Sequence, residues 1–186
     1  MQLVDQGQAF TALVDFAHTP AALEKALTSL QQIKHNRLIV LFGCAGERDP
    51  ARRQMGKIAG QLADIIIITN EDNRSEDVQQ IMKQIAQSAE QAGAQPGPED
   101  PAEINRYPVY YQIADRREAI NFAISLAQKN DLLDLTGKGH EQSLNVDGLE
   151  TDWDDASVLK ECLAELRSAP PILSQSQTSS TIRCRF

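Results

Sequence analysis

Four short polar segments carry most of the side chains in this 186-residue chain that could do chemistry. They are 15–20 (DFAHTP), 43–49 (GCAGERD), 70–77 (NEDNRSED) and 136–141 (TGKGHE). Each follows a predicted strand, and ligands of open α/β sheets bind beyond the carboxyl ends of the strands. The residues expected together at that edge are Asp15, His18, Arg48, Glu71, Arg74, Lys138, His140 and Glu141.

Each segment taken alone also has an ordinary structural explanation. Asp15 and His18 could be a helix cap and a surface histidine, and the GxxG of 43–46 could be only a glycine turn. Arg48 is more informative, because a guanidinium just before a helix can hold a carboxylate or a phosphate through two hydrogen bonds. A solvated turn explains most of 70–77, and Glu71 and Arg74 are the exceptions.

None of the segments is a phosphate loop of the kind that binds and cleaves ATP. The pattern GxxxxGK[ST] occurs nowhere in the chain, and Lys138 in TGKGHE is followed by Gly139. The segment 43–49 does not match the dinucleotide pattern GxGxxG either. Any machinery that cleaves ATP must therefore lie outside these residues.

An alternation of strands and helices positions the four segments. Strands are predicted over 10–15, 37–42, 64–69, 109–113 and 132–135, and helices over 21–32, 50–62, 77–92, 115–129 and 154–167. A DG pair at 147–148 predicts a hairpin, and the proline-rich stretch 93–108 predicts a surface loop. The predicted fold class is α/β, a three-layer Rossmann-like domain with a mainly parallel sheet of five or six strands.

Composition argues against several classes of function. The 18 basic and 26 acidic residues give a net charge of −8, the wrong sign for neutralising nucleic-acid phosphates. Cys44, Cys162 and Cys184 form no CxxC pair, so neither a disulfide framework nor a metal cluster is indicated. No apolar run is long enough for a membrane span, and the first residues lack the pattern of a signal peptide. We expect a cytoplasmic protein with no nucleic-acid or membrane partner.

The four segments also carry a family resemblance. VDFAHTPAALEKAL, LFGCAGERDPARRQMGKIAGQLAD, TNEDNRSED and GKGHE, in this order, resemble the C-terminal domain of the Mur ligases, most of all the MurE type, the UDP-N-acetylmuramoyl-tripeptide synthetases. The resemblance runs from about Gly7 to Leu166. Folylpolyglutamate and cyanophycin synthetases resemble the chain less at VDFAHTP and GKGHE.

The resemblance implies a three-domain cytoplasmic enzyme of peptidoglycan precursor synthesis. Such a ligase transfers the γ-phosphoryl group of ATP to a peptide carboxylate, and the amine of an amino acid attacks the acyl phosphate, leaving an amide, ADP and phosphate. The first domain binds the uridine nucleotide, and the second carries the P-loop and the Mg²⁺ sites. The third domain contributes part of the ATP site and binds the incoming amino acid.

The same resemblance divides the chain. Residues 1–9 would end a linker from the missing central domain, and 10–167 would form the C-terminal domain. Residues 168–186 match nothing in the family, and their composition, rich in Ser, Thr and Pro, predicts a disordered tail. ATP and Mg²⁺ would be bound mostly by the missing central domain, so no catalytic residue and no metal ligand is assigned here. The partners implied are the two missing domains, ATP, a diamino acid and UDP-MurNAc-dipeptide.

Individual roles follow from the resemblance by position. In the nucleotide half, Asp15 would contact the ATP ribose, Phe16 would present a ring to adenine, and His18 would lie near the phosphates. Arg48 would bind the carboxylate of the incoming amino acid. Glu71, Asp72 and Arg74 would lie in the loop that selects the amino acid side chain. Gly137 and Glu141 would hold the distal polar end of that side chain. Lys138 and His140 receive no definite role.

Two departures from the family pattern bear on the substrate. The selecting loop usually reads DNPR, whereas residues 71–74 read EDNR, so diaminopimelate and lysine both stay open as the amino acid added. Phe16 replaces the usual tyrosine and keeps only the ring. The alternatives to a ligase of this type are a non-catalytic α/β binding module and a related ligase of folylpolyglutamate or cyanophycin type.

Overall fold

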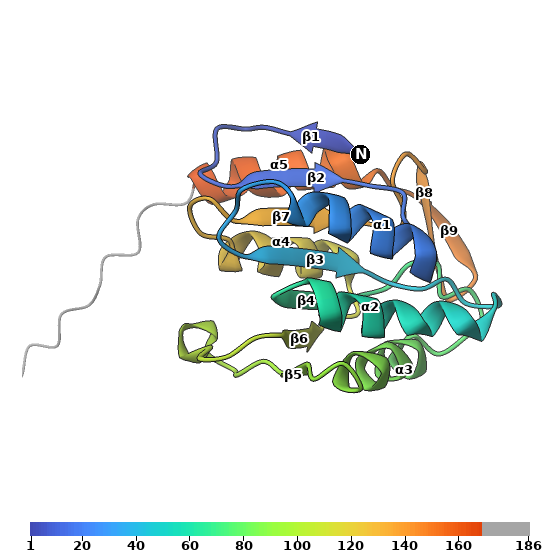
Figure 1. Ribbon diagram of the computed structural model, residues 1–186. Coiled ribbons are helices and arrows are strands. Elements are labelled where there is room, and N and C mark those ends of the chain that lie inside the picture. Colours follow the sequence, from blue (N-terminus) through green and yellow to red (C-terminus); the bar gives the residue numbers. More distant parts are fainter. Residues whose placement is uncertain (169–186) are drawn as a thin grey trace, which may run out of the picture.

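The structure is a computed structural model that describes residues 1–168. At its centre is a seven-stranded sheet with the order β1-β2-β7-β3-β4-β6-β5 (Figure 1). The strands are β1 (Gln2–Val4), β2 (Thr11–Val14), β3 (Leu38–Phe42), β4 (Ile65–Ile68), β5 (Gln95–Pro96), β6 (Val109–Gln112) and β7 (Leu132–Leu135). All neighbours pair in parallel except β1, which is antiparallel to β2.

The five predicted strands are confirmed as β2, β3, β4, β6 and β7, so the predicted α/β class holds. The sheet has seven strands rather than five or six, because two short strands were not predicted at its edges. β1 lies within residues 1–9, and β5 lies within the stretch 93–108 that was expected to be loop throughout. Edge strands are held mainly by backbone pairing on one side and leave little side-chain pattern in the sequence.

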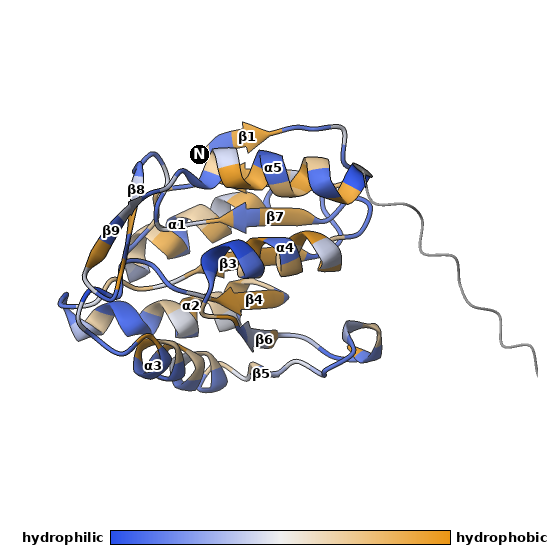
Figure 2. Cartoon of the chain, turned by 180° about the vertical axis from the view of Figure 1, so that it is seen from behind, coloured by the Kyte–Doolittle hydropathy of each residue, from blue (hydrophilic) through white to orange (hydrophobic). Residues whose placement is uncertain are grey.

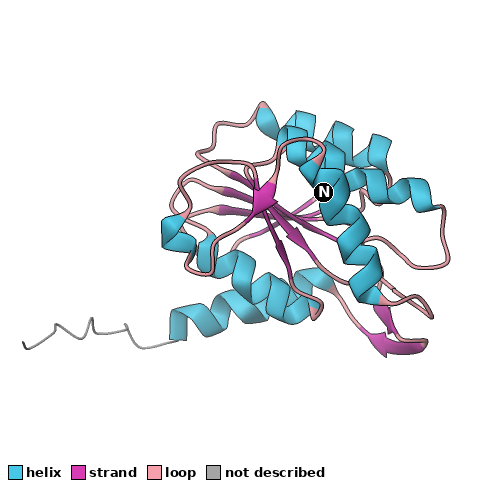
Figure 3. Ribbon diagram, turned by 90° about the horizontal axis from the view of Figure 1, so that it is seen from below, coloured by secondary structure: helices cyan, strands magenta, loops and turns pink. Residues whose placement is uncertain are grey.

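Helices cover both faces of the sheet (Figure 3). They are α1 (Pro20–Gln31), α2 (Met55–Leu62), α3 (Val78–Glu90), α4 (Arg116–Leu126) and α5 (Asp155–Ser168), with 3-10 turns η1 (Pro50–Gln54) and η2 (Pro101–Glu103). One apolar core joins the sheet to α4 and α5, and a second joins it to α1, α2 and α3. Apolar and polar residues alternate along α4 and α5 (Figure 2), and the buried apolar ones belong to the first core.

The chain order explains why the helices divide between the faces. From β2 the chain passes through β3 and β4 to β6 in one direction across the sheet, and it then returns to place β7 between β2 and β3. Because crossovers between parallel strands are right-handed, the outward helices lie on one face and the returning helix α4 lies on the other. The carboxyl ends of β2, β7 and β3 flank this reversal of strand order, and such a reversal is where ligands of open α/β sheets bind.

A separate hairpin, β8 (Ser143–Val146) and β9 (Leu149–Asp152), stands at the carboxyl-end edge of the sheet (Figure 1). It confirms the hairpin predicted from the DG pair. Within residues 1–168, no helix is both long and apolar enough to cross a membrane. Of the predicted tail 168–186, Ser168 is the last residue of α5, and residues 169–186 lie outside the described residues.

Candidate functional site

The four polar segments lie at one edge of the sheet, as the alternation of elements predicts. They follow β2, β3, β4 and β7, whose carboxyl ends meet there. Three of the loops end in helix caps, because Thr19 Oγ1, Asp49 Oδ1 and Asp77 Oδ1 each accept a hydrogen bond from a backbone N–H two or three residues later. These caps fix where each loop stops and keep the polar side chains at the edge.

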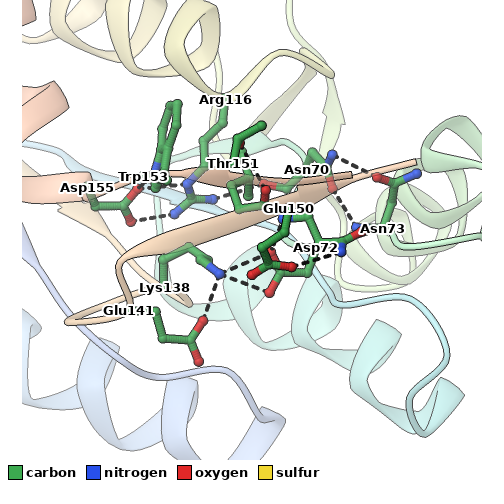
Figure 4. Close-up of polar contacts among 12 residues, drawn as sticks. Asn70, Asp72, Asn73, Arg116, Lys138, Glu141, Glu150, Thr151, Trp153 and Asp155 are labelled. Atoms are coloured by element: carbon green, nitrogen blue, oxygen red, sulfur yellow. Dashed lines mark hydrogen bonds and ion pairs between the residues drawn. The ribbon is translucent and has the colours of Figure 1, made fainter. Parts of the chain in front are cut away.

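Lys138 is the centre of a buried charge cluster (Figure 4). Its Nζ lies 3.0 and 2.9 Å from the two carboxylate oxygens of Asp72 and 2.7 Å from Glu141 Oε2. Burial by itself would lower the pKa of Lys138, but the hydrogen bonds to Glu141 and Asp72 outweigh it and raise the pKa. The Lys138 side chain is only 1% exposed, whereas those of Asp72 and Glu141 are 18% and 43% exposed. The cluster joins the loop after β7 to the loop after β4.

Glu71 lies beside this cluster and is itself buried. Its carboxyl group packs on Gly137, where a Cβ atom would come within 2.2 Å of Oε2, so only glycine fits at that position. Oε2 has no hydrogen-bond partner among the described residues. Burial is the main cause that raises the pKa of Glu71 to about 8, and Arg116 opposes the shift. A buried carboxyl oxygen without a partner is the type of group that a cationic ligand would satisfy.

A second buried pair, Arg116 and Asp155, braces the site from the α4 and α5 side. The guanidinium donates two hydrogen bonds to the carboxylate, at 2.8 and 2.6 Å, and both side chains are fully buried. Arg116 also donates to the backbone oxygens of Asn70 and Thr136, and Thr136 Oγ1 donates to Ala17 O. These bonds tie together the loops after β4, β7 and β2.

Sequence reasoning missed this brace. Arg116 and Asp155 are far apart in the chain, and each stands at the start of an amphipathic helix, where a charged residue is ordinary. Trp153, the chain's one tryptophan, donates from Nε1 to Asp155 Oδ1. Nothing in the local pattern distinguishes these residues from solvated helix ends.

The loops after β3 and β4 are joined by direct contacts. Ser75 donates through Oγ to Glu47 Oε1, and Gly46 N–H donates to Asp72 O. The bonds from Ser75 lower the pKa of Glu47, and the charges of Arg74 and Arg48 act in the same direction. The two arginines therefore lie near one carboxylate. Within residues 1–168 neither of them forms an ion pair within 4 Å, and Arg48 is exposed.

The residues expected to contact ATP gather at the β2 end of the edge. The Phe16 ring lies 4.6 Å from the His18 ring and 4.8 Å from the His140 ring, measured between centroids. His18 Nδ1 lies 2.8 Å from Phe16 O, and the Asp15 carboxylate lies 3.3 Å from the Met1 amine. A surface pocket of about 460 Å³ opens here beside α1 and is lined by Asp15, Phe16, Ala17, His18, Ala22 and Lys25 among others. Its size and its exposed ring suit part of a nucleotide.

The described residues do not suit a resident magnesium ion. No group of three or more His, Cys, Asp or Glu side chains in residues 1–168 is arranged to hold a metal. The carboxylates of Asp72 and Glu141 are already engaged by Lys138.

Comparison with known proteins agrees with this architecture. The family model described as "Mur ligase, glutamate ligase domain" matches residues 1–139. A UDP-N-acetylmuramyl-tripeptide synthetase of Roseiflexus sp. (strain RS-1) is 40% identical over 167 residues, which are 89% of this chain and 31% of that protein. A UDP-N-acetylmuramoyl-L-alanyl-D-glutamate--2,6-diaminopimelate ligase of Geobacillus kaustophilus is 38% identical over 165 residues, 88% of this chain and 31% of that protein.

The solved structures include one of a ligase with the same printed name as the Geobacillus protein. It superimposes with a TM-score of 0.76 at 30% sequence identity, and the match covers 91% of this chain and 32% of the other. The chain thus spans about a third of the length of the relatives that it matches. Its fold, its motifs and these matches together show that the chain belongs to the Mur ligase family and corresponds to the C-terminal domain of the MurE type.

Proposed function

We propose that this chain is the amino-acid-binding and ATP-closing domain of a MurE-type ligase. The whole enzyme would add a diamino acid to UDP-N-acetylmuramoyl-L-alanyl-D-glutamate in the cytoplasm, with ATP converted to ADP and phosphate. The names of the curated relatives support this reaction class. The nucleotide-binding and P-loop domains would come from the two thirds of those relatives that this chain does not match.

The observation that carries the proposal is the buried carboxyl group of Glu71 beside the Lys138 cluster, whose Oε2 has no hydrogen-bond partner among the described residues. The distal ammonium of a diamino acid would supply the missing partner for Glu71 and a further one for Glu141. Arg48 and Arg74 would bind carboxylate, and Arg48 is free to do so through both guanidinium nitrogens. A zwitterion with a second amine needs both signs of charge on rigid strand ends, and this edge has both.

The identity of the diamino acid depends on Arg74 and Asp72. Diaminopimelate has a second carboxylate that could pair with Arg74, and lysine lacks it. Asp72 would repel that carboxylate if its charge were not neutralised, but it accepts from Lys138 at 2.9 Å. Both amino acids therefore enter the test, with meso-diaminopimelate favoured by the relatives' names.

At the β2 end, Asp15 would accept hydrogen bonds from the ribose hydroxyls, Phe16 would stack on the adenine, and His18 would face the phosphates. The described residues contain no phosphate-cradling loop, so the chain by itself is expected to bind without catalysing ligation. Amide formation by the purified chain with ATP and both substrates would contradict this expectation. Catalysis would require closure of this domain on a P-loop domain, which would position the acyl phosphate and the amine.

Calorimetric titration of the purified chain tests the proposal. The ligands are meso-diaminopimelate, L-lysine and ATP at millimolar concentration, because one domain of a closing enzyme binds weakly. We expect one diamino acid to bind, and Arg48→Ala and Glu141→Ala to abolish that binding while ATP binding stays. Binding of ATP alone, with neither diamino acid, would contradict the amino acid site and favour a non-catalytic nucleotide module. A fourth titration, with L-glutamate, tests the alternative, because binding of glutamate in place of a diamino acid would favour a ligase of folylpolyglutamate type.

A further inference from the structure

The side chain of Asn73 is a saturated hydrogen-bonding centre in the loop after β4. It is fully buried. Its Nδ2 donates to Glu76 O and to Asp147 Oδ1, both at 2.7 Å. Its Oδ1 accepts from Asn70 Nδ2 at 3.0 Å and from Asp147 N at 3.1 Å. Every donor and acceptor position of the amide is therefore used, and a proline at position 73 could make none of these bonds.

Two of those four bonds reach the β8–β9 hairpin. Asp147 lies in its turn with φ 52°, and it both accepts from and donates to the Asn73 amide. Asp72, the residue before Asn73, adds a third bond to the hairpin, because its Oδ1 accepts from Asn145 N–H at 2.8 Å. Figure 4 shows Asp72 and Asn73 side by side beneath the hairpin. The hairpin is not hydrogen-bonded into the seven-stranded sheet, so these bonds are what fasten its turn to the domain.

The loop needs such fastening because its backbone is strained. Asp72 and Arg74, on either side of Asn73, have φ values of 53° and 55°. Non-glycine residues in the left-handed region persist only where the surroundings hold them there. The close approach of Gly46, whose Cβ would come within 2.0 Å of Asn73 O, holds the loop from the other side.

We propose that Asn73 and Asp147 form a clasp that makes the β8–β9 hairpin part of the substrate-selecting apparatus. The clasp rests on the proposed function, since Asp72 and Arg74 are the side chains that it positions. Neither clasp residue touches the substrate. They act as positioning residues, and the hairpin turn fixes the direction in which Arg74 leaves the backbone.

The test compares Asp147→Gly with Asp147→Asn. Glycine keeps the left-handed turn and removes the carboxylate acceptor, whereas asparagine tolerates the same φ and restores an acceptor. In the glycine variant we expect the amide protons of Asn73 and Asn145 to exchange about fivefold faster, as loss of one hydrogen bond implies. Affinity for whichever of L-lysine and meso-diaminopimelate the unaltered chain binds should fall about threefold or more, with ATP affinity and melting temperature unchanged. Asp147→Asn should restore both values.

Two results would overturn the clasp. One is unchanged amide exchange in Asp147→Gly, and the other is an equal loss of amino acid and ATP affinity, which would indicate general destabilisation. Leu149→Ala, at a hairpin residue that is 68% exposed, is the control for surface changes in the hairpin. If the unaltered chain binds neither amino acid, the proposed function fails, and the exchange rates still decide whether the clasp holds the loop.

Discussion

The carboxyl-end edge of the sheet divides into a proposed amino acid half, residues 71–74 and 137–141, and a proposed nucleotide half, residues 15–18. The two halves differ in how their polar groups are satisfied. In the amino acid half, the buried cations Lys138 and Arg116 each have carboxylate partners within 3 Å. In the nucleotide half, Phe16 is 38% exposed and the nearby strand β7 buries the carboxyl group of Asp134 with no partner for either oxygen. Glu71 Oε2 is the exception in the amino acid half, since it also lacks a partner. We therefore expect the amino acid half to be largely built in advance with one position left for a ligand, and the nucleotide half to be completed by its ligand.

The most damaging change should be the removal of one member of the brace in the amino acid half. Asp155→Ala leaves the Arg116 guanidinium buried without its partner, and we expect a loss of about 3 to 5 kcal/mol in the free energy of unfolding. Urea denaturation measures it. The matched control is Arg117→Ala on the same helix, whose ion pairs with Glu161 and Glu165 are exposed and should contribute less than about 1 kcal/mol. Equal effects of the two changes would refute the brace.

Removing a buried carboxyl group near the nucleotide half should raise the free energy of unfolding. Burial raises the pKa of Asp134 to about 8, with the charge of Asp15 adding to the shift. A carboxyl group whose pKa is higher in the folded chain favours folding at low pH, and this advantage is lost as the pH rises from about 4 to about 8. Asp134→Leu should therefore raise stability at pH 7 by about 2 to 4 kcal/mol.

The pH dependence of stability separates a charge penalty at Asp134 from better packing of the leucine side chain. The advantage of Asp134→Leu over the unaltered chain should shrink steadily as urea denaturation is repeated at lower pH, toward pH 4. An advantage that stays constant with pH would mean that the carboxyl group carries no charge penalty in the fold. Asp134→Leu should leave diamino acid affinity unchanged, since Asp134 is buried within β7, paired with Leu13 of β2 and Val40 of β3, and is not part of the loop that follows β7.

Glu71 should make diamino acid binding depend on pH. With a pKa of about 8, the carboxyl group is mostly protonated at pH 6, and an ammonium ligand binds the ionised form. Affinity should therefore rise nearly tenfold per pH unit from pH 6 to pH 7 and level off above about pH 8. Calorimetry across this range measures the slope. Glu71→Gln should bind weakly with no such slope, and a retained slope in that variant would assign the proton to another group.

The smallest effect is expected from the exposed ring of the nucleotide half. Phe16→Ala should weaken ATP binding a few-fold, because stacking on one ring contributes about 1 kcal/mol. Phe16→Tyr keeps the ring and is the matched control. Loss of diamino acid affinity in Phe16→Ala would show that the two halves are not independent.

The sequence predicted the scaffold better than the site. Buried runs such as 64–69 and capped helices have local patterns, so the five main strands, the five helices and the hairpin could be placed from them. The helix predicted from Pro50 begins as a 3-10 turn, and only its second part, Met55–Leu62, is α-helical. The Arg116 brace and the Asn73 clasp depend on contacts between residues 39 and 74 positions apart, which no local pattern records.

The site loops themselves were expected from their position after strands, and their side chains do gather at one edge. What could not be predicted is the state of each group. Asp72, assigned in part to a solvated turn, is engaged by Lys138, and Lys138, left without a role, pairs with both Asp72 and Glu141. Burial and partner count decide such states, and both arise only from the packed fold.

The most direct test of the account is chemical-shift mapping of the chain by NMR, with a diamino acid and ATP added separately. The account predicts that the diamino acid shifts amides of 71–74 and 137–141, and that ATP shifts amides of 15–18. The division of the edge into two binding halves would be contradicted if the diamino acid shifted only amides of the loop after β2. It would also be contradicted if both ligands shifted only amides at the amino ends of the strands.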